Sequence, residues 1–221
     1  MPHLTDDALR FVRATGPQPD ETLEEMDAYA EREGFPHVGP EVGGFLRLVA
    51  RIAGAQSIFE FGSGYGYSAY WFAEALPAEG EIVLTEVDEE ELEMAREHLG
   101  NGGYDHLAHY ELGDALDTIE RYDGPFDVVL IDHQKHRYVE AFEAVREKLA
   151  PGGVVIADNA MSADDVVVFS DLLAHVGGDD PQLNEGTRGI ANYLDHVRAE
   201  PGFETQVLPF GEGIAVSQFE G

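Results

Sequence analysis

Apolar residues fall into short continuous runs that alternate with segments of helical periodicity. The runs at residues 57–61, 81–86, 128–131 and 154–157 are typical of buried strands, and a short strand is also expected at 106–112. Between them, segments 67–76, 89–99, 115–121, 138–149 and 163–176 have helical spacing, and several end at glycine or proline. This alternation predicts an α/β fold with a doubly wound, mainly parallel sheet.

The two ends of the chain have different patterns from this repeated unit. Three helices are expected at residues 5–14, 20–33 and 41–53, so residues 1–54 are predicted to form a helical lid or flank beside an α/β core of residues 55–221. After a loop at 177–187, a last helix is expected at 189–199. Segments 204–209 and 213–218, joined by a Gly211-Glu212 turn, predict a β-hairpin. With no repeat or linker, residues 1–221 are interpreted as one domain.

Composition narrows the class of protein. The chain has 221 residues, of which 43% are hydrophobic, enough for one substantial core. It has no cysteine, which excludes disulfides, thiolate catalysis and cysteine-zinc sites. No run approaches the roughly 18 apolar residues of a membrane span, and the N-terminus lacks the plan of a signal peptide. We expect a soluble cytoplasmic protein with no membrane partner.

The net charge is strongly negative. Acidic residues number 44 and basic residues 13, which gives −31, and Lys135 and Lys148 are the only lysines. An acidic surface can bind basic partners, or it can keep a protein soluble in a very salty cytosol. The acids are spread along the whole chain, which favours the second interpretation, a halophilic protein. The charge also disfavours binding to a nucleic-acid backbone.

Polar side chains follow two neighbouring runs where predicted strands end. Asp132 and Lys135 come after the fourth predicted strand, and Asp158 and Asn159 come after the fifth. Ligands bind at the carboxyl ends of strands in open α/β sheets, and hard oxygen ligands suit Mg²⁺ or a similar cation. Each acid alone could be a turn former or a helix cap. The whole set favours a metal-assisted active site.

A glycine-rich turn follows the first predicted strand. Residues 60–68 read Glu-Phe-Gly-Ser-Gly-Tyr-Gly-Tyr-Ser, which is neither the GxGxxG of a dinucleotide site nor a Walker loop. Glu86, 26 residues after Glu60, is a candidate for binding ribose hydroxyls or is simply an exposed strand end. Asp114 could accept a hydrogen bond from adenine or cap a helix. Carboxylates would repel a pyrophosphate, so a nucleoside without phosphates, such as S-adenosylmethionine, fits better.

These motifs resemble those of the cation-dependent class I O-methyltransferases, the catechol and caffeoyl-CoA O-methyltransferase group. The most specific parts are Asp132-His133-x-Lys135-x-Arg137-Tyr138 and Ala157-Asp158-Asn159. The resemblance implies the Rossmann-like class I methyltransferase fold with a C-terminal antiparallel hairpin. It also implies S-adenosylmethionine, Mg²⁺ or another divalent cation, and methyl transfer to a small phenolic acceptor of the ortho-dihydroxy type.

The resemblance also assigns roles to residues. It implies that Asp132, Asp158 and Asn159 bind the cation and that Lys135 is the general base. The cofactor-binding set that it implies is Val38, Glu60, Gly62, Gly64, Tyr67, Ser68, Glu86, Val87, Asp114, Ala115, Asp132 and His133.

The chain also departs from the family pattern. Gln134 stands where catechol enzymes have an aromatic residue. No acid clearly matches the one that binds the second catechol hydroxyl, and Asn192 and Asp195 are candidates only.

Other functions compete with this interpretation. Some relatives methylate hydroxylated uridine in tRNA, and Arg188 and Arg198 could contact phosphate, although the charge disfavours it. A non-catalytic module that binds S-adenosylmethionine is a second alternative. A dehydrogenase is disfavoured because the GxGxxG spacing is missing. The resemblance allows a homodimer, because such proteins often pair through their N-terminal helices.

Overall fold

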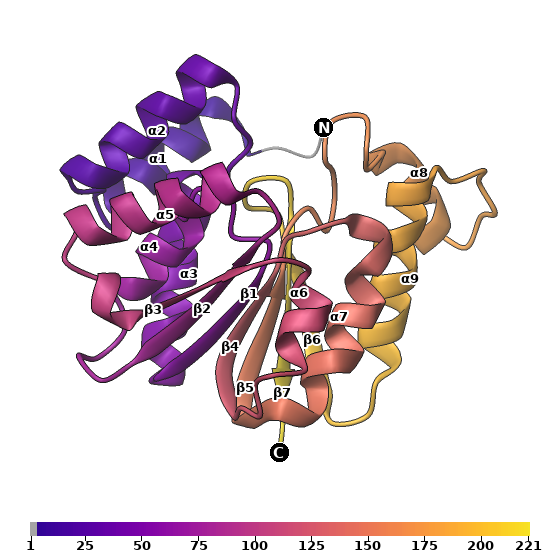
Figure 1. The fold of residues 1–221 in the computed structure, drawn as a ribbon. Coiled ribbons are helices and arrows are strands. Elements are labelled where there is room, and N and C mark those ends of the chain that lie inside the picture. The colour runs from indigo at the N-terminus through magenta and orange to yellow at the C-terminus, as the bar shows by residue number, and fades with distance from the viewer. Residues whose placement is uncertain (1–3) are drawn as a thin grey trace.

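The computed structural model describes residues 4–221, which form a central sheet with helices on both faces (Figure 1). In this part of the chain the sheet has seven strands in the order β3-β2-β1-β4-β5-β7-β6. The first five are parallel, and β7 runs antiparallel to both β5 and β6. The strands are β1 (Ser57–Phe61), β2 (Glu81–Glu86), β3 (Ala108–Leu112), β4 (Phe126–Ile131), β5 (Leu149–Ala157), β6 (Phe203–Leu208) and β7 (Ile214–Phe219).

Helices α1 to α5 lie on one side of the sheet and α6 to α9 on the other (Figure 1). Right-handed crossovers between parallel strands produce this division. The first layer contains α1 (Asp6–Thr15), α2 (Glu21–Glu33), α3 (Gly39–Ala53), α4 (Tyr67–Ala73) and α5 (Glu89–Asn101). The second contains α6 (Ala115–Ile119), α7 (Tyr138–Val145), α8 (Phe169–Val176) and α9 (Glu185–Ala199).

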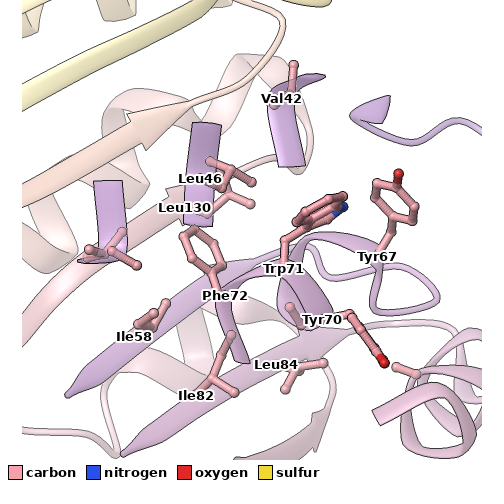
Figure 2. Packing of buried hydrophobic residues seen from close by; sticks show 14 of the residues in the cluster. Val42, Leu46, Ile58, Tyr67, Tyr70, Trp71, Phe72, Ile82, Leu84 and Leu130 are labelled. Atoms are coloured by element: carbon pink, nitrogen blue, oxygen red, sulfur yellow. The ribbon is translucent and has the colours of Figure 1, made fainter. Parts of the chain in front are cut away.

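Strands β1, β2, β4, β5 and β7 each contribute side chains to two cores, because successive side chains point to opposite faces of a sheet. In β1, Ile58 joins the cluster that contains Leu46 of α3 and Phe72 of α4 (Figure 2). The next residue, Phe59, joins the opposite cluster with Phe142 of α7. Burial on both faces explains why the central strands β1, β4 and β5 contain mostly apolar residues, and it holds the carboxyl ends of these strands rigidly in place.

The structure confirms the predicted fold class, including the C-terminal antiparallel hairpin. The predicted strands and helices occur in the expected order. Among residues 4–221, no helix has both the length and the apolar character that a membrane crossing requires.

Two helices in the second half of the chain begin at other residues than predicted. The helix expected at 163–176 begins only at Phe169. Before it, Asp164 has a positive φ of 38°, and Ala163 and Val167 form an isolated antiparallel bridge, so residues 163–168 are a loop. The β-branched run 166–168 favours extended backbone over helix. The last helix begins at Glu185 rather than 189, because the Asn184 side chain caps it by accepting a hydrogen bond from the N–H of Thr187.

Candidate functional site

The carboxyl ends of the parallel strands open onto a cavity of about 1120 Å³. Helix α1, the glycine loop after β1, the loop after β5 and the β6–β7 turn also line it. This is more room than one small ligand needs, so the cavity can hold a nucleoside cofactor and an acceptor together. The predicted site residues that line it are Val38, Gly62, Gly64, Tyr67, Ser68, Glu86, Val87, Asp114, Ala115, Asp132, His133, Lys135, Asp158 and Asn159.

The three predicted cation ligands come from two adjacent strand ends. The last paired residues of β4 and β5 are Ile131 and Ala157, so Asp132 and Asp158 leave the sheet side by side. Asp158 is 6% exposed, and its Oδ1 atom has no hydrogen-bond partner. Burial, followed by repulsion from Asp132, raises the pKa of Asp158 to about 7. Asn159 has a positive φ of 56°, a conformation that asparagine adopts more readily than most residues.

Lys135 lies beside these acids in the short 3₁₀ turn Lys135–Arg137. Its Nζ atom donates hydrogen bonds to Asp132 Oδ1 at 2.7 Å and to the hydroxyl of Tyr138 at 2.8 Å. The Tyr138 hydroxyl in turn donates to the backbone carbonyl of Asp158 at 3.2 Å. A fully buried phenol therefore connects the amine of Lys135 to the second strand end and fixes its position.

The glycine loop comes very close to the end of β4. Gly62 has a φ of 83°, and a Cβ atom there would lie 2.5 Å from the carbonyl oxygen of Asp132, so only glycine fits. Gly64 N–H donates to Glu86 Oε2 at 2.9 Å. The other oxygen of Glu86 accepts from the N–H groups of Val87 and Asp88. Glu86 therefore links β2 to the glycine loop at the edge of the cavity.

Asp114 and His133 line another part of the cavity. Asp114 caps α6 by accepting from Leu116 N–H, and it accepts a second hydrogen bond from Arg137 at 2.6 Å. The Arg137 guanidinium lowers the pKa of Asp114. The His133 ring stacks on Tyr138 with an interplanar angle of 7°, and burial lowers the pKa of His133 to about 4. His133 therefore contributes a neutral aromatic ring to the wall of the cavity.

Glu60 is the one predicted cofactor-binding residue that does not line the cavity. Its side chain is fully buried at the end of β1, and neither carboxylate oxygen has a hydrogen-bond partner that meets geometric criteria. Burial raises the pKa of Glu60 to about 8, against weaker opposing effects of Ser68 and Ser63. Its fully buried side chain therefore offers no surface to a ligand in the cavity.

The structure adds one acid that the sequence analysis did not assign to the site. Glu212, in the turn between β6 and β7, lines the cavity, and its Oε2 atom accepts a hydrogen bond from Asn159 Nδ2 at 2.7 Å. Asn192 and Asp195 do not line the cavity, and Asp195 instead pairs with His175 on α8. The sequence contained one indication of this residue, a charged side chain between two glycines in the predicted hairpin turn.

Comparison with known proteins identifies the family. The family model described as O-methyltransferase matches residues 18–218. The chain belongs to the O-methyltransferase family. A catechol O-methyltransferase from Niastella koreensis is 33% identical to this O-methyltransferase over 152 residues, which cover 66% of this chain and 68% of the relative. Caffeoyl-CoA O-methyltransferase 2 of Populus trichocarpa is 25% identical, with 96% of this chain and 89% of the relative covered.

A solved structure with a similar fold leads to the same conclusion. The O-methyltransferase from Bacillus cereus in complex with SAH superimposes with a TM-score of 0.83 at 25% identity, and 96% of this chain and 97% of that chain are covered. These comparisons confirm the predicted resemblance, and with it the prediction of an S-adenosylmethionine-dependent O-methyltransferase.

Proposed function

We propose that this O-methyltransferase uses Mg²⁺ or another divalent cation to methylate one hydroxyl of a small ortho-dihydroxy aromatic acceptor. The observation that supports this most directly is the meeting of Asp132, Asp158 and Asn159 at two neighbouring strand ends, with Lys135 Nζ 2.7 Å from Asp132. The similarity to a catechol O-methyltransferase from Niastella koreensis points to the same acceptor class.

The side chains at this point suit a hard cation. Asp158 Oδ1 is buried without a partner, and the repulsion between Asp158 and Asp132 is of the kind that a cation relieves. Carboxylate and amide oxygens are the ligands that Mg²⁺ prefers. Asp132, Asp158 and Asn159 would hold the cation, which would supply Lewis-acid chemistry by lowering the pKa of a bound hydroxyl.

Other residues of the site would remove the acceptor's proton and bind the cofactor. A phenol has a pKa of about 10, so it is mostly protonated at neutral pH and needs a base. Lys135 is the proposed base, because Tyr138 and Asp132 hold its Nζ atom beside the cation ligands. The cofactor, S-adenosylmethionine, supplies the electrophilic methyl group. Glu86, which lines the cavity at the end of β2, is the proposed ligand of the cofactor's ribose.

Glu212 is the proposed acceptor for the second hydroxyl of the aromatic ring. Glu212 accepts a hydrogen bond from Asn159, one of the proposed cation ligands, whereas Lys135 donates to Asp132, another of them. Glu212 and Lys135 therefore contact different members of the proposed cation site. A carboxylate there can accept a hydrogen bond from one hydroxyl while the other is directed at Lys135. Two adjacent hydroxyls would therefore be recognised together, which supports an ortho-dihydroxy acceptor over a monophenol.

The proposal is tested with methyl-labelled S-adenosylmethionine, catechol and Mg²⁺, with and without EDTA. We expect EDTA to abolish methylation and added Mg²⁺ to restore it. Lys135→Ala and Asp158→Ala should each lower kcat by about a hundredfold or more, because one removes the base and the other a cation ligand. Binding of S-adenosylhomocysteine, measured by calorimetry, should stay within about twofold of the original protein in both variants.

Lys148→Ala is the matched control for the lysine. Its Nζ atom donates to the carbonyls of Ile119 and Tyr122 outside the cavity. This variant should lower the melting temperature but keep kcat. Methylation that survives EDTA would contradict the role of the cation, and full turnover by Lys135→Ala would contradict the role of the base.

A further inference from the structure

The loop between α2 and α3 places a histidine at the cavity. His37 Nε2 lies 2.9 Å from Asp27 Oδ1 of α2, and because a carboxylate only accepts, Nε2 is the donor. The His37 ring meets the ring of Tyr67 edge-on, at 4.7 Å between centroids and 89° between planes. Its side chain is 22% exposed and lines the cavity next to Val38. A neighbour on each side therefore fixes the ring.

Most other cationic or basic groups at the cavity already have a place in the site. The cationic or basic groups among the described lining residues are Arg13, His37, His133 and Lys135. Arg13 forms two hydrogen bonds to Glu41, and Lys135 lies among the proposed cation ligands. Burial keeps His133 neutral, since its pKa is lowered to about 4. His37 remains as the group that can meet an anion.

The cofactor brings one anion into this acidic cavity. S-adenosylmethionine and S-adenosylhomocysteine carry a carboxylate at the end of the methionyl arm. If Glu86 binds the ribose and the sulfur faces Lys135, the arm must extend along the glycine loop towards Ser68 and Tyr67. His37 packs on Tyr67 there. Asp132, Asp158 and Glu212 all carry the wrong charge for this carboxylate, so a nearby donor matters.

We propose that His37, oriented by Asp27, binds the carboxylate of the cofactor's methionyl arm. Asp27 accepts a hydrogen bond from Nε2–H, and a ring that holds both protons in the complex donates its Nδ1–H to the cofactor carboxylate. The interaction is a charge-assisted hydrogen bond, the stronger class of such bonds. This inference rests on the use of S-adenosylmethionine and does not depend on the catechol acceptor or on the divalent cation.

Two ligands that differ at the methionyl arm test the inference. S-adenosylhomocysteine has the carboxylate, whereas 5′-methylthioadenosine keeps the adenosine and sulfur but lacks the amino-acid end. We expect His37→Gln to weaken S-adenosylhomocysteine binding by about ten- to a hundredfold. Binding of 5′-methylthioadenosine should change by less than about twofold. In turnover, the KM for S-adenosylmethionine should rise while kcat at saturation changes little.

Two further variants separate binding from folding. Asp27→Asn should weaken the binding of S-adenosylhomocysteine by several-fold and leave the binding of 5′-methylthioadenosine unchanged. This variant tests the same inference if His37→Gln does not fold. His98→Gln is the control, because His98 packs edge-on against Tyr65 in the same aromatic cluster but does not line the cavity. It should affect neither ligand.

Equal losses for both ligands would assign His37 a purely structural role and overturn the inference, as would unchanged binding of S-adenosylhomocysteine. Neither outcome would bear on the proposed acceptor, because the binding measurements contain no catechol and no cation.

Discussion

At the scale of single residues, the cavity brings together side chains that lie far apart in the sequence. Asn159 and Glu212 are connected by a hydrogen bond of 2.7 Å, although 53 positions separate them. The turn after β6 brings Glu212 back over the end of β5 because β7 pairs with β5. One acid from the last hairpin therefore completes a group that otherwise comes from adjacent strand ends.

Replacing Glu212 by glutamine should affect the acceptor and not the cofactor. We expect Glu212→Gln to raise the KM for catechol by about tenfold or more, because a hydrogen bond to a charged group is lost. Binding of S-adenosylhomocysteine should not change. Steady-state kinetics with varied catechol and calorimetry with S-adenosylhomocysteine measure the two effects.

Glu204→Gln is the control for this prediction, since Glu204 is an exposed residue of β6 in the same hairpin. It should leave both constants unchanged. An unaltered catechol KM in Glu212→Gln would remove Glu212 from the acceptor site.

The strand-end residues could be predicted from the sequence, whereas Glu212 could not. Asp132 and Asp158 follow apolar runs directly, and parallel strands place their carboxyl ends at the same edge. Glu212 depends on the register of an antiparallel hairpin, which has no comparable signal in its own neighbourhood. The burial of Glu60 could not be predicted from the sequence either, because the exposure of a strand-end acid depends on how the following loop folds.

At the scale of elements, α9 positions the turn that carries Lys135. Gly189 of α9 lies so close to this turn that an added Cβ atom would overlap the carbonyl oxygen of Lys135 and come within 2.6 Å of the Cα atom of His136. Both are backbone atoms, which cannot move aside as a flexible side chain can. The close approach of the helix therefore fixes the backbone that presents the lysine.

Adding a methyl group at this contact should move the lysine. We expect Gly189→Ala to cost about 1–3 kcal/mol of stability through overpacking and to lower kcat by about tenfold or more. The affinity for S-adenosylhomocysteine should stay nearly constant. Urea unfolding, kinetics with catechol and calorimetry together measure these effects.

Gly100→Ala on α5 is the matched control, because no heavy atom lies within 4 Å of the added Cβ atom there. Alanine has a higher helix propensity than glycine, so this variant should be neutral or slightly stabilising. If Gly189→Ala kept its full kcat, the contact would matter for packing alone.

The order of elements followed from the sequence more closely than their ends. Apolar runs identified β1, β2, β4 and β5 because burial on both faces leaves few polar positions, whereas β3 is only partly buried and has no such run. The helix expected at 163–176 was too long by six residues, since its first part contains Val166, Val167 and Val168. Only the tertiary structure decides that Val167 turns into the core while Val166 remains exposed.

At the scale of the whole molecule, charge is the dominant feature. The net charge is −31, and neither of the two lysines is exposed. Lys135 binds Asp132 and Tyr138, and Lys148 binds the carbonyls of Ile119 and Tyr122. The surface of the described residues therefore relies mainly on arginine to offset its carboxylates, and mutual repulsion opposes the compact state.

Salt should therefore stabilise this protein. We expect the melting temperature to rise by several degrees between about 0.1 M and about 1 M KCl, since the Debye length falls from about 10 Å to about 3 Å over that range. Thermal unfolding followed by circular dichroism measures the change. A melting temperature that stays constant or falls would show that repulsion among the carboxylates has little influence on stability, and it would count against the halophilic interpretation.

The sheet order also constrains how the molecule is assembled during synthesis. The strand made after β6 does not join the sheet beyond it but inserts between β5 and β6. Until residues 214–219 have left the ribosome, β6 has no neighbour in the sheet and Glu212 cannot reach Asn159. A nascent chain therefore already contains the cavity residues at the ends of the parallel strands, whereas Glu212 still lacks its contact with Asn159.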